Sequence, residues 1–432
     1  MLSAFAQAFR TPDLRRKLLF TLFIMALFRA GTFIPTPGVS VHNINQCMAQ
    51  SEGAGLLDLV NLFSGGALMQ LSIFALGIMP YITASIIIQL LRVVVPRFDD
   101  LHKEGQAGQA KLTQYTRYLT IFLSVMQATG FISLARSGRM FPGCQEKIIP
   151  NESVWVFIVM IIVMTAGSSC IMWLGEVITD KGIGNGMSLL IFTSIIARLP
   201  SQLFNIGATA ENGVIKVLGI IALIMAITLA IVFVEQAMRR IPVQYAKRMV
   251  GSRMYGGSAT YIPIKINMSG VIPVIFSTSI LAMPMMIAQF GDPTKPWVQF
   301  IMRYFQQRSW LYLLLDALLI IFFSFFYTQI TFDPDEVADN MKKYGGFVPG
   351  VRAGRPTADL LRYIINRITT AGSLYLVLVA MIPVLALIPM GITQGQLPFG
   401  GTTLLIIVGV GLQTVKEVNA QLRQHHYEGF LR

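Results

Sequence analysis

Ten apolar runs, separated by polar loops, dominate this sequence. An α-helix rises about 1.5 Å per residue, so roughly 20 apolar residues cross a hydrocarbon core about 30 Å thick. Because lipid offers the backbone no hydrogen bonds, runs of this length predict membrane-spanning helices. We predict spans at residues 18–34, 72–95, 115–134, 154–175, 183–199, 214–234, 270–290, 311–330, 371–389 and 402–415.

The composition places the chain among all-α membrane proteins. Hydrophobic residues make up 54% of the 432 residues and charged residues only 13%, which is too apolar for a soluble protein of this length. Residues 1–17 form a basic leader that we expect at the membrane surface. The first apolar run follows basic residues, as in a signal peptide, but Arg29 and Pro35 end it without a small-residue cleavage site. We therefore interpret it as a retained first span.

Lysine and arginine predict the orientation of the chain, because basic loops stay in the cytoplasm. The leader, the tail and the loops on the same side hold 25 of the 34 basic residues. An even number of spans returns both termini to one side of the membrane. Both termini are therefore predicted to be cytoplasmic.

The cysteines are few and indicate no disulfide framework. Cys47, Cys144 and Cys170 contain no CxxC spacing. Cys47 and Cys144 fall in loops that we place outside the cell, where they could in principle pair. The sequence does not favour that pairing.

A short apolar stretch at residues 56–68 precedes the second span. It is too short to cross the membrane, and a broken segment at membrane depth is tolerated only inside protein or beside water. The stretch therefore indicates a cavity, and its small residues suit a movable plug. The alternative is a re-entrant loop that packs and never moves. The plug residues that we predict are Leu59, Asn61, Phe63, Ser64, Gly65 and Gly66.

Two cytoplasmic loops, at residues 236–268 and 332–369, are far longer than a turn between antiparallel helices requires. Both mix basic residues with Tyr, Phe, Pro and Gly. This mixture suits a protruding hairpin that docks a large acidic partner, such as a motor protein or ribosomal RNA. The alternative is that the loops only obey the rule that basic loops stay inside.

The sequence contains no recognisable catalytic motif. There is no HExxH, no GxSxG and no Walker lysine, so we predict neither an enzyme nor a cofactor. Coupled transporters need ionisable groups near the membrane midplane. Here Glu176 and Glu235 lie at cytoplasmic ends of spans, and Asp316 and Arg29 lie near outer ends. An ion-coupled secondary transporter and an intramembrane enzyme remain as alternatives, and both are disfavoured.

Several ordered motifs resemble the SecY family, the central channel subunits of the bacterial Sec protein translocase. They are NLFSGGAL, IFALGIMPYITASIIIQLL, QYTRYL, MWLGEVITDKGIGNGMS, KKYGGFVPGVR and FGGTTLLI, and they run from the first span to the last. The resemblance implies ten transmembrane helices in two inverted five-helix halves around an hourglass pore. The halves are residues 18–205 and 206–422, with a short plug half-helix in the first and a tail at 423–432. It also implies a gate that opens sideways between the second and seventh spans.

The same resemblance implies a ring of apolar side chains at the waist of the pore. Ile78 and Ile82 lie four residues apart, as do Met187 and Ile191, so each pair shares a helical face. An apolar constriction excludes ions by dewetting while its side chains mould around a passing peptide. The alternative is that these are ordinary core or lipid-facing residues. The predicted ring consists of Ile78, Ile82, Met187, Ile191, Ile275 and Ile406.

The implied function is a protein-conducting channel in the plasma (inner) membrane. It passes unfolded secretory polypeptides and their signal peptides, and it releases apolar segments of nascent chains sideways into membrane lipid. The resemblance implies the subunits SecE and SecG, the ATPase SecA and the ribosome as partners. We predict that polar groups line the gate at Gln89, Gln127 and Asn267. We predict that partners dock at Arg239, Arg240, Lys247, Arg248 and Arg352.

Overall fold

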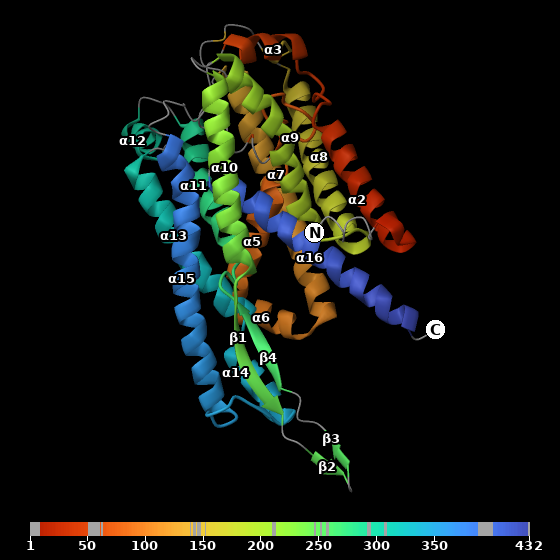
Figure 1. Ribbon diagram of the computed structural model, residues 1–432. Coiled ribbons are helices and arrows are strands. Elements are labelled where there is room, and N and C mark those ends of the chain that lie inside the picture. The colour runs from red at the N-terminus through yellow and green to blue at the C-terminus, as the bar shows by residue number, and fades with distance from the viewer. Residues whose placement is uncertain are drawn as a thin grey trace.

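The computed structural model describes residues 9–50, 61, 64–138, 140, 144, 148–151, 153–209, 213–245, 248–250, 253–255, 259–291, 295–305, 309–387 and 401–430. Long helices stand side by side in a bundle, and an arm of strands and helices projects from one end (Figure 1). A helix occupies each of the ten predicted spans. These helices are α2 (Pro12–Gly31), α5 (Met79–Val94), α7 (Gln106–Arg136), α8 (Val154–Lys181), α9 (Gly186–Thr209), α10 (Gly213–Gln236), α11 (Ile272–Phe290), α13 (Trp310–Thr331), α15 (Arg355–Leu387) and α16 (Gly401–Phe430).

By length and composition, six helices in the described part of the chain can cross a membrane. A bent pair, α5 and α6 (Pro96–Lys103), makes seven, and the chain turns by 100° between them. Shorter apolar helical segments occupy Gly186–Ser201 and Ile272–Pro284, in α9 and α11. The prediction of a mostly helical, multi-span membrane protein is confirmed.

The second span begins later than the sequence predicts, at Met79 rather than at residue 72. Residues just before it form turns, and Gly77 has a left-handed φ of +56°. Pro80 lies in the first turn of α5, where its missing N–H costs nothing. The apolar run therefore continues through a segment that is not helical, which hydropathy alone cannot distinguish.

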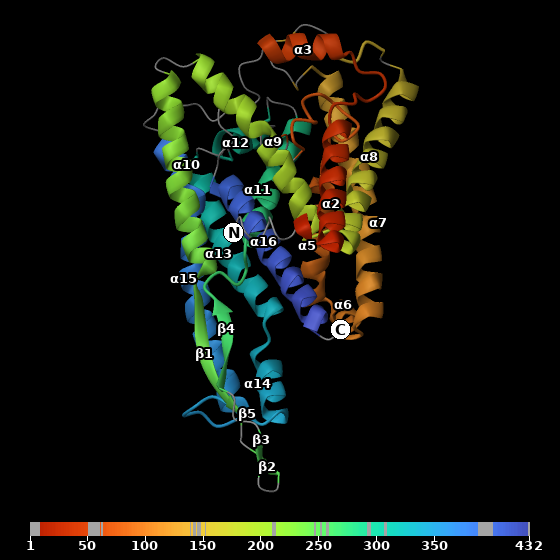
Figure 2. The same ribbon diagram turned by 45° about the vertical axis from the view of Figure 1, so that its right-hand side comes forward.

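The same pattern of helix neighbours occurs in both halves of the chain. The first half consists of α2, α5, α7, α8 and α9, in that order. Its first helix packs on its fourth and fifth helices, and each helix from the second to the fourth packs on the next one along the chain. The second half, in the order α10, α11, α13, α15 and α16, has the same five pairs. Equivalent helices lie five spans apart and so run in opposite directions, as in an inverted repeat. The halves meet where α9 packs on α10 and α16, α2 on α16, and α11 on α5 and α7 (Figure 2).

The projecting arm adds short β-strands to the otherwise helical fold, at the loops that we interpreted as suiting a protruding hairpin. Strand β1 (Met238–Tyr245) pairs antiparallel with β4 (Ala259–Lys265), and β5 (Gly346–Phe347) completes the order β4-β1-β5. Strands β2 (Arg248–Val250) and β3 (Arg253–Tyr255) pair at the tip. Ile241 and Val243 are buried between exposed neighbours, against α14 (Pro334–Lys343) and α15. This alternation is typical of a half-buried strand.

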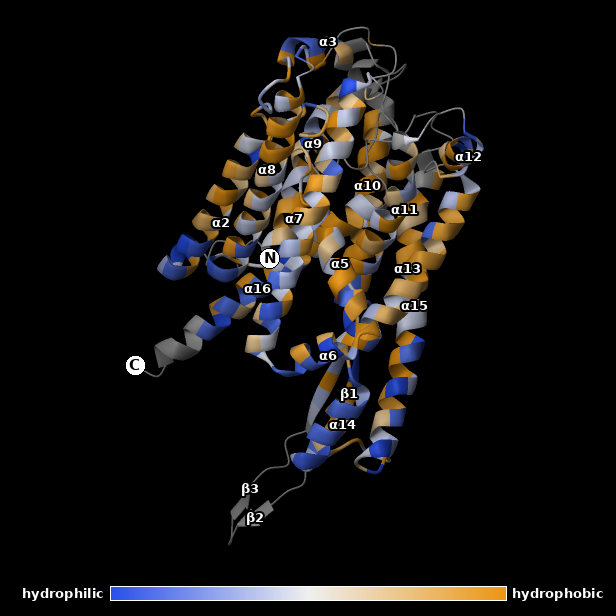
Figure 3. Cartoon of the chain, turned by 180° about the vertical axis from the view of Figure 1, so that it is seen from behind, coloured by the Kyte–Doolittle hydropathy of each residue, from blue (hydrophilic) through white to orange (hydrophobic). Residues whose placement is uncertain are grey.

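Polarity divides the molecule along its length. Hydrophobic residues cover the middle of the helix bundle, whereas β1, α14 and the adjacent end of α15 are mostly hydrophilic (Figure 3). The arm is therefore a hydrophilic projection at one end of a hydrophobic bundle. The short helix α3 (Val41–Gln50) lies at the opposite end, as does α12 (Pro296–Tyr304) (Figure 1).

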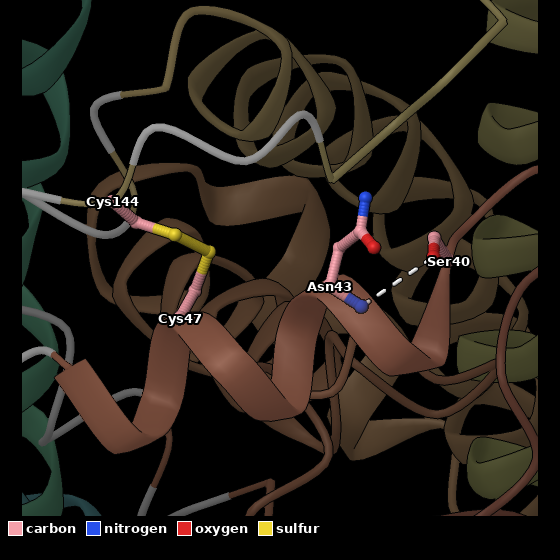
Figure 4. The surroundings of a disulfide bond; sticks show 4 residues. All are labelled: Ser40, Asn43, Cys47 and Cys144. Carbon is pink, nitrogen blue, oxygen red and sulfur yellow. Dashed lines mark hydrogen bonds between the residues drawn. A yellow bond between two sulfur atoms is a disulfide. The ribbon is translucent and has the colours of Figure 1, made fainter.

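A disulfide joins Cys47 in α3 to Cys144, although the sequence did not favour this pair (Figure 4). Their Cα atoms lie 5.3 Å apart although 97 positions separate them along the chain. Cys47 is fully buried in a cluster that joins α3, the segment before α5, and the ends of α7 and α8. Tertiary packing brings the two cysteines together, and their spacing in the sequence does not indicate that they pair.

Candidate functional site

Six apolar side chains from different parts of the chain meet in the centre of the bundle. They come from the start of α5, from α9, from α11 and from α16. Five are buried in one hydrophobic cluster and the sixth, Ile275, packs against it. The backbone N–H of Ile82 donates to the carbonyl of Ile78 at 3.1 Å, which stacks the first pair on one face. The five buried residues are Ile78, Ile82, Met187, Ile191 and Ile406.

A cavity of about 400 Å³ opens beside this cluster, on the side of the bundle that carries the arm. Ile82, Met187 and Ile191 form part of its wall, together with Ile275 of α11. The remaining lining includes polar groups of α5, α7 and α8. The cavity is therefore bounded by polar groups on one part of its wall and by the apolar cluster on another.

A charged pair on the cavity wall holds α7 against α8. Arg117 donates from Nε and Nη2 to the two carboxylate oxygens of Glu176, at 3.0 and 2.7 Å. Such a two-point contact fixes orientation as well as distance. The sequence analysis placed Glu176 at a cytoplasmic helix end but did not identify its partner.

The predicted plug is described in part. Asn61 and Ser64 are buried, and the carbonyl of Asn61 accepts from Gly66 N–H at 2.9 Å and from the Ser64 hydroxyl at 3.0 Å. Asn61 is helical and residues 64–71 form turns, whereas most of the stretch predicted as a half-helix lies outside the described residues. Ala67 belongs to the same buried cluster as the six apolar side chains. Residues 56–60, among them Leu59, and Phe63 lie outside the described residues.

The three polar residues predicted for the gate lie in different surroundings. Gln89 lines the cavity and donates to the Ser85 hydroxyl at 3.4 Å. Gln127 is half-buried on α7. Asn267 is buried ahead of α11 and donates to Glu235 of α10 and to the carbonyl of Gly270. The hydrogen bonds of Asn267 thus stay within the second half of the chain.

The residues predicted for docking belong to the arm. Arg239 and Arg240 are exposed on β1, and the Arg240 guanidinium lies over the ring of Tyr261, 4.9 Å from its centroid. Arg352 is exposed in the turn that leads into α15. Arg248 lies in β2, and Lys247 is outside the described residues.

A sequence profile of the SecY family matches residues 72–415. The protein translocase subunit SecY of Streptomyces galbus is 57% identical to this chain over 438 residues, which cover 100% of both chains. The chain belongs to the SecY family.

Solved structures of SecY-like channels share the fold. A structure of a SecY protein, whose plug domain is described as stabilising the closed state of the translocation channel, matches with a TM-score of 0.62 at 18% identity. A channel from a canine ribosome-channel complex of the endoplasmic reticulum matches with a TM-score of 0.61 at 18% identity. Each match covers 94% of this chain and 91% of the other chain. The arrangement of the two halves is therefore that of the SecY fold.

Proposed function

We propose that this SecY-family chain is the protein-conducting channel of a plasma-membrane translocase. It passes unfolded secretory polypeptides and releases apolar segments sideways into lipid. The observation that carries the proposal is the meeting of apolar side chains from both halves, between an open cavity and the plug segment. A narrow apolar constriction next to a cavity with polar walls suits a polypeptide that passes through a bilayer in an unfolded state.

In this proposal the six clustered side chains form the pore ring. An ion that entered the ring would lose water in a low-dielectric surrounding, at a cost of several kcal/mol. A polypeptide instead meets apolar side chains with which it makes dispersion contacts, and the flexible Met187 adjusts to residues of different size. The ring therefore holds back ions without selecting one substrate.

The lateral exit lies between α5 and α11, which pack together across the boundary of the halves. A segment in the pore partitions into lipid according to its transfer free energy, which is unfavourable by about 2.5 to 3.5 kcal/mol for a central Asp or Lys. Gln89, Gln127 and Asn267 remain our candidates for polar residues that line or support this gate. Of these, Gln89 is the one supported by a position on the cavity wall.

Energy for transport must come from partners, which we place on the arm. SecA or a translating ribosome would dock at Arg239, Arg240, Lys247, Arg248 and Arg352, with SecE and SecG beside the bundle. The exposed strands and arginines of the arm support this assignment, as does the ribosome complex in which the canine channel was solved. The arm belongs to the two loops that hold much of the basic charge, so we place it and both termini in the cytoplasm.

The disulfide supports the same orientation, because disulfides persist in oxidising compartments. We expect a membrane-impermeant maleimide, applied to intact cells, to label Cys47 and Cys144 only after reduction. Cys170, which lies within α8, is expected to stay unlabelled and serves as the control. If labelling instead required inverted vesicles, the two cysteines would face the cytoplasm and the predicted orientation would be wrong.

Reconstitution tests the function as a whole. Liposomes that hold this chain with SecE are expected to import a secretory precursor when SecA and ATP are added. Failure to import, combined with uptake of small solutes in the absence of an ATPase, would favour an ion-coupled transporter. Cleavage of a membrane substrate would favour an intramembrane enzyme.

A further inference from the structure

A charged side chain of the first span contacts the plug. Arg29 lies in the last turn of α2 and is half-buried. Its Nη1 donates to the carbonyl oxygen of Gly65 at 2.9 Å, and its guanidinium lies over the ring of Phe33, 5.2 Å from the centroid. A charge near the end of a membrane span is costly unless it is paired, and both contacts reduce that cost.

The geometry at Gly65 is shaped around this contact. Gly65 has a left-handed φ of +67°, which presents its carbonyl to Arg29. A Cβ at this position would lie 2.8 Å from Arg29 Nη1 and 3.3 Å from Ser194 Cα of α9. A side chain here is strained by the left-handed backbone, pushes the Arg29 guanidinium aside and crowds α9. Gly65 thus sits between two helices of the first half.

The chain that follows the plug is fixed separately. Thr36 N–H donates to the carbonyl of Leu71 at 3.0 Å, and Ile73 N–H donates to the carbonyl of Ile34 at 2.9 Å. These two backbone bonds tie the segment after the plug to the segment after α2. A plug that leaves the pore can therefore pivot on this anchor, but it must first break the bond from Arg29.

We propose that Arg29 is a positioning residue that latches the plug in its closed place. The proposal rests on the channel function inferred above. A guanidinium bound to a backbone carbonyl is a charge-assisted hydrogen bond, stronger than a neutral one. It is also reversible, because water can replace the carbonyl once the plug withdraws. Arg29 then sets the ratio of closed to open channels without touching the polypeptide in transit.

Resting ion conductance in planar bilayers, measured on the chain with SecE, tests the latch. Arg29→Leu is expected to raise the open fraction about tenfold, the factor that corresponds to the loss of roughly 1.4 kcal/mol of contact to a charged group. Arg29→Lys is expected to give an intermediate conductance, since an ammonium still donates. Arg303→Leu is the matched control, because Arg303 of α12 also lies over an aromatic ring, that of Tyr304, but on another surface.

Gly65→Ala tests the same contact from the other partner and does not depend on whether the arginine variant folds. It is expected to leak like Arg29→Leu, because its Cβ displaces the guanidinium. Gly138→Ala is its control: Gly138 has a similar φ of +70°, and a Cβ there meets nothing within 4 Å. If both Gly65→Ala and Arg29→Leu conduct like the parent channel, the latch does not exist.

A second measurement separates a latch from general damage. Arg29→Leu is expected to import a precursor with a weakened signal peptide at an increased rate, while the intact precursor is imported as before. Slower import of both precursors would mean structural damage and overturn the proposal. If the parent chain imports no precursor at all while Arg29→Leu still leaks, the channel function is wrong and the latch stands.

Discussion

A channel in which Ile82 and Ile191 are both replaced by glycine is expected to conduct ions at rest about a hundredfold better than the parent channel. The two side chains come from α5 and α9, and both are buried in the central cluster. Their removal widens the constriction enough for water, so an ion keeps part of its hydration shell. A reduction of the barrier by about 3 kcal/mol, within the several kcal/mol that dehydration costs, corresponds to this factor.

The measurement is single-channel recording in planar bilayers, with a control for the loss of two isoleucines from helices. Ile162 of α8 and Ile196 of α9 are 61% and 37% exposed on the surface of the bundle. Replacing these two by glycine removes the same atoms from helices without touching the ring. Equal conductance of the ring variant and this control variant would mean that the six side chains do not form the seal.

Arg352→Glu is expected to slow SecA-driven import at least about 30-fold while the resting conductance stays unchanged. The guanidinium of Arg352 is exposed in the turn before α15 and can fork onto a carboxylate of the motor. Reversing the charge replaces attraction by repulsion, and loss of a charge pair at an interface costs about 2 kcal/mol or more.

Import into proteoliposomes at saturating ATP measures this effect. Arg97→Glu is the matched control, because Arg97 is an exposed arginine of α6 outside the two long loops. If Arg352→Glu imports precursor as fast as Arg97→Glu, then Arg352 plays no part in docking the motor.

The sequence predicted the positions of the long helices because lipid leaves the backbone few choices. It did not predict where α5 begins, since the turns around Gly77 are as apolar as the helix that follows. The arm was interpreted as a protruding hairpin but its strands were not predicted, although Ile241 and Val243 alternate with Arg240, Pro242 and Gln244. That alternation spans only one short strand, which is too little to predict a sheet by itself.

The contacts that individual side chains make were the least predictable part of the site. The family resemblance selected six apolar residues that do lie together, although their role as a ring stays a prediction. By contrast, Arg29 binds a backbone carbonyl. Every residue carries such a carbonyl, so the sequence does not indicate which one the arginine contacts. Asn267 bonds to Glu235 across a loop that folds back, and Cys47 meets Cys144 only where the helix ends opposite the arm pack together.

The link between Cys47 and Cys144 closes a macrocycle that contains the plug segment, α5, α6 and α7. In the proposed channel, one edge of the lateral exit and the plug are therefore parts of a single covalent loop. Tension on either part is transmitted to the other through bonds as well as through packing. We expect outward movement of the plug and displacement of that edge to be mechanically coupled while the loop is closed, and to become more independent once a reductant cuts it.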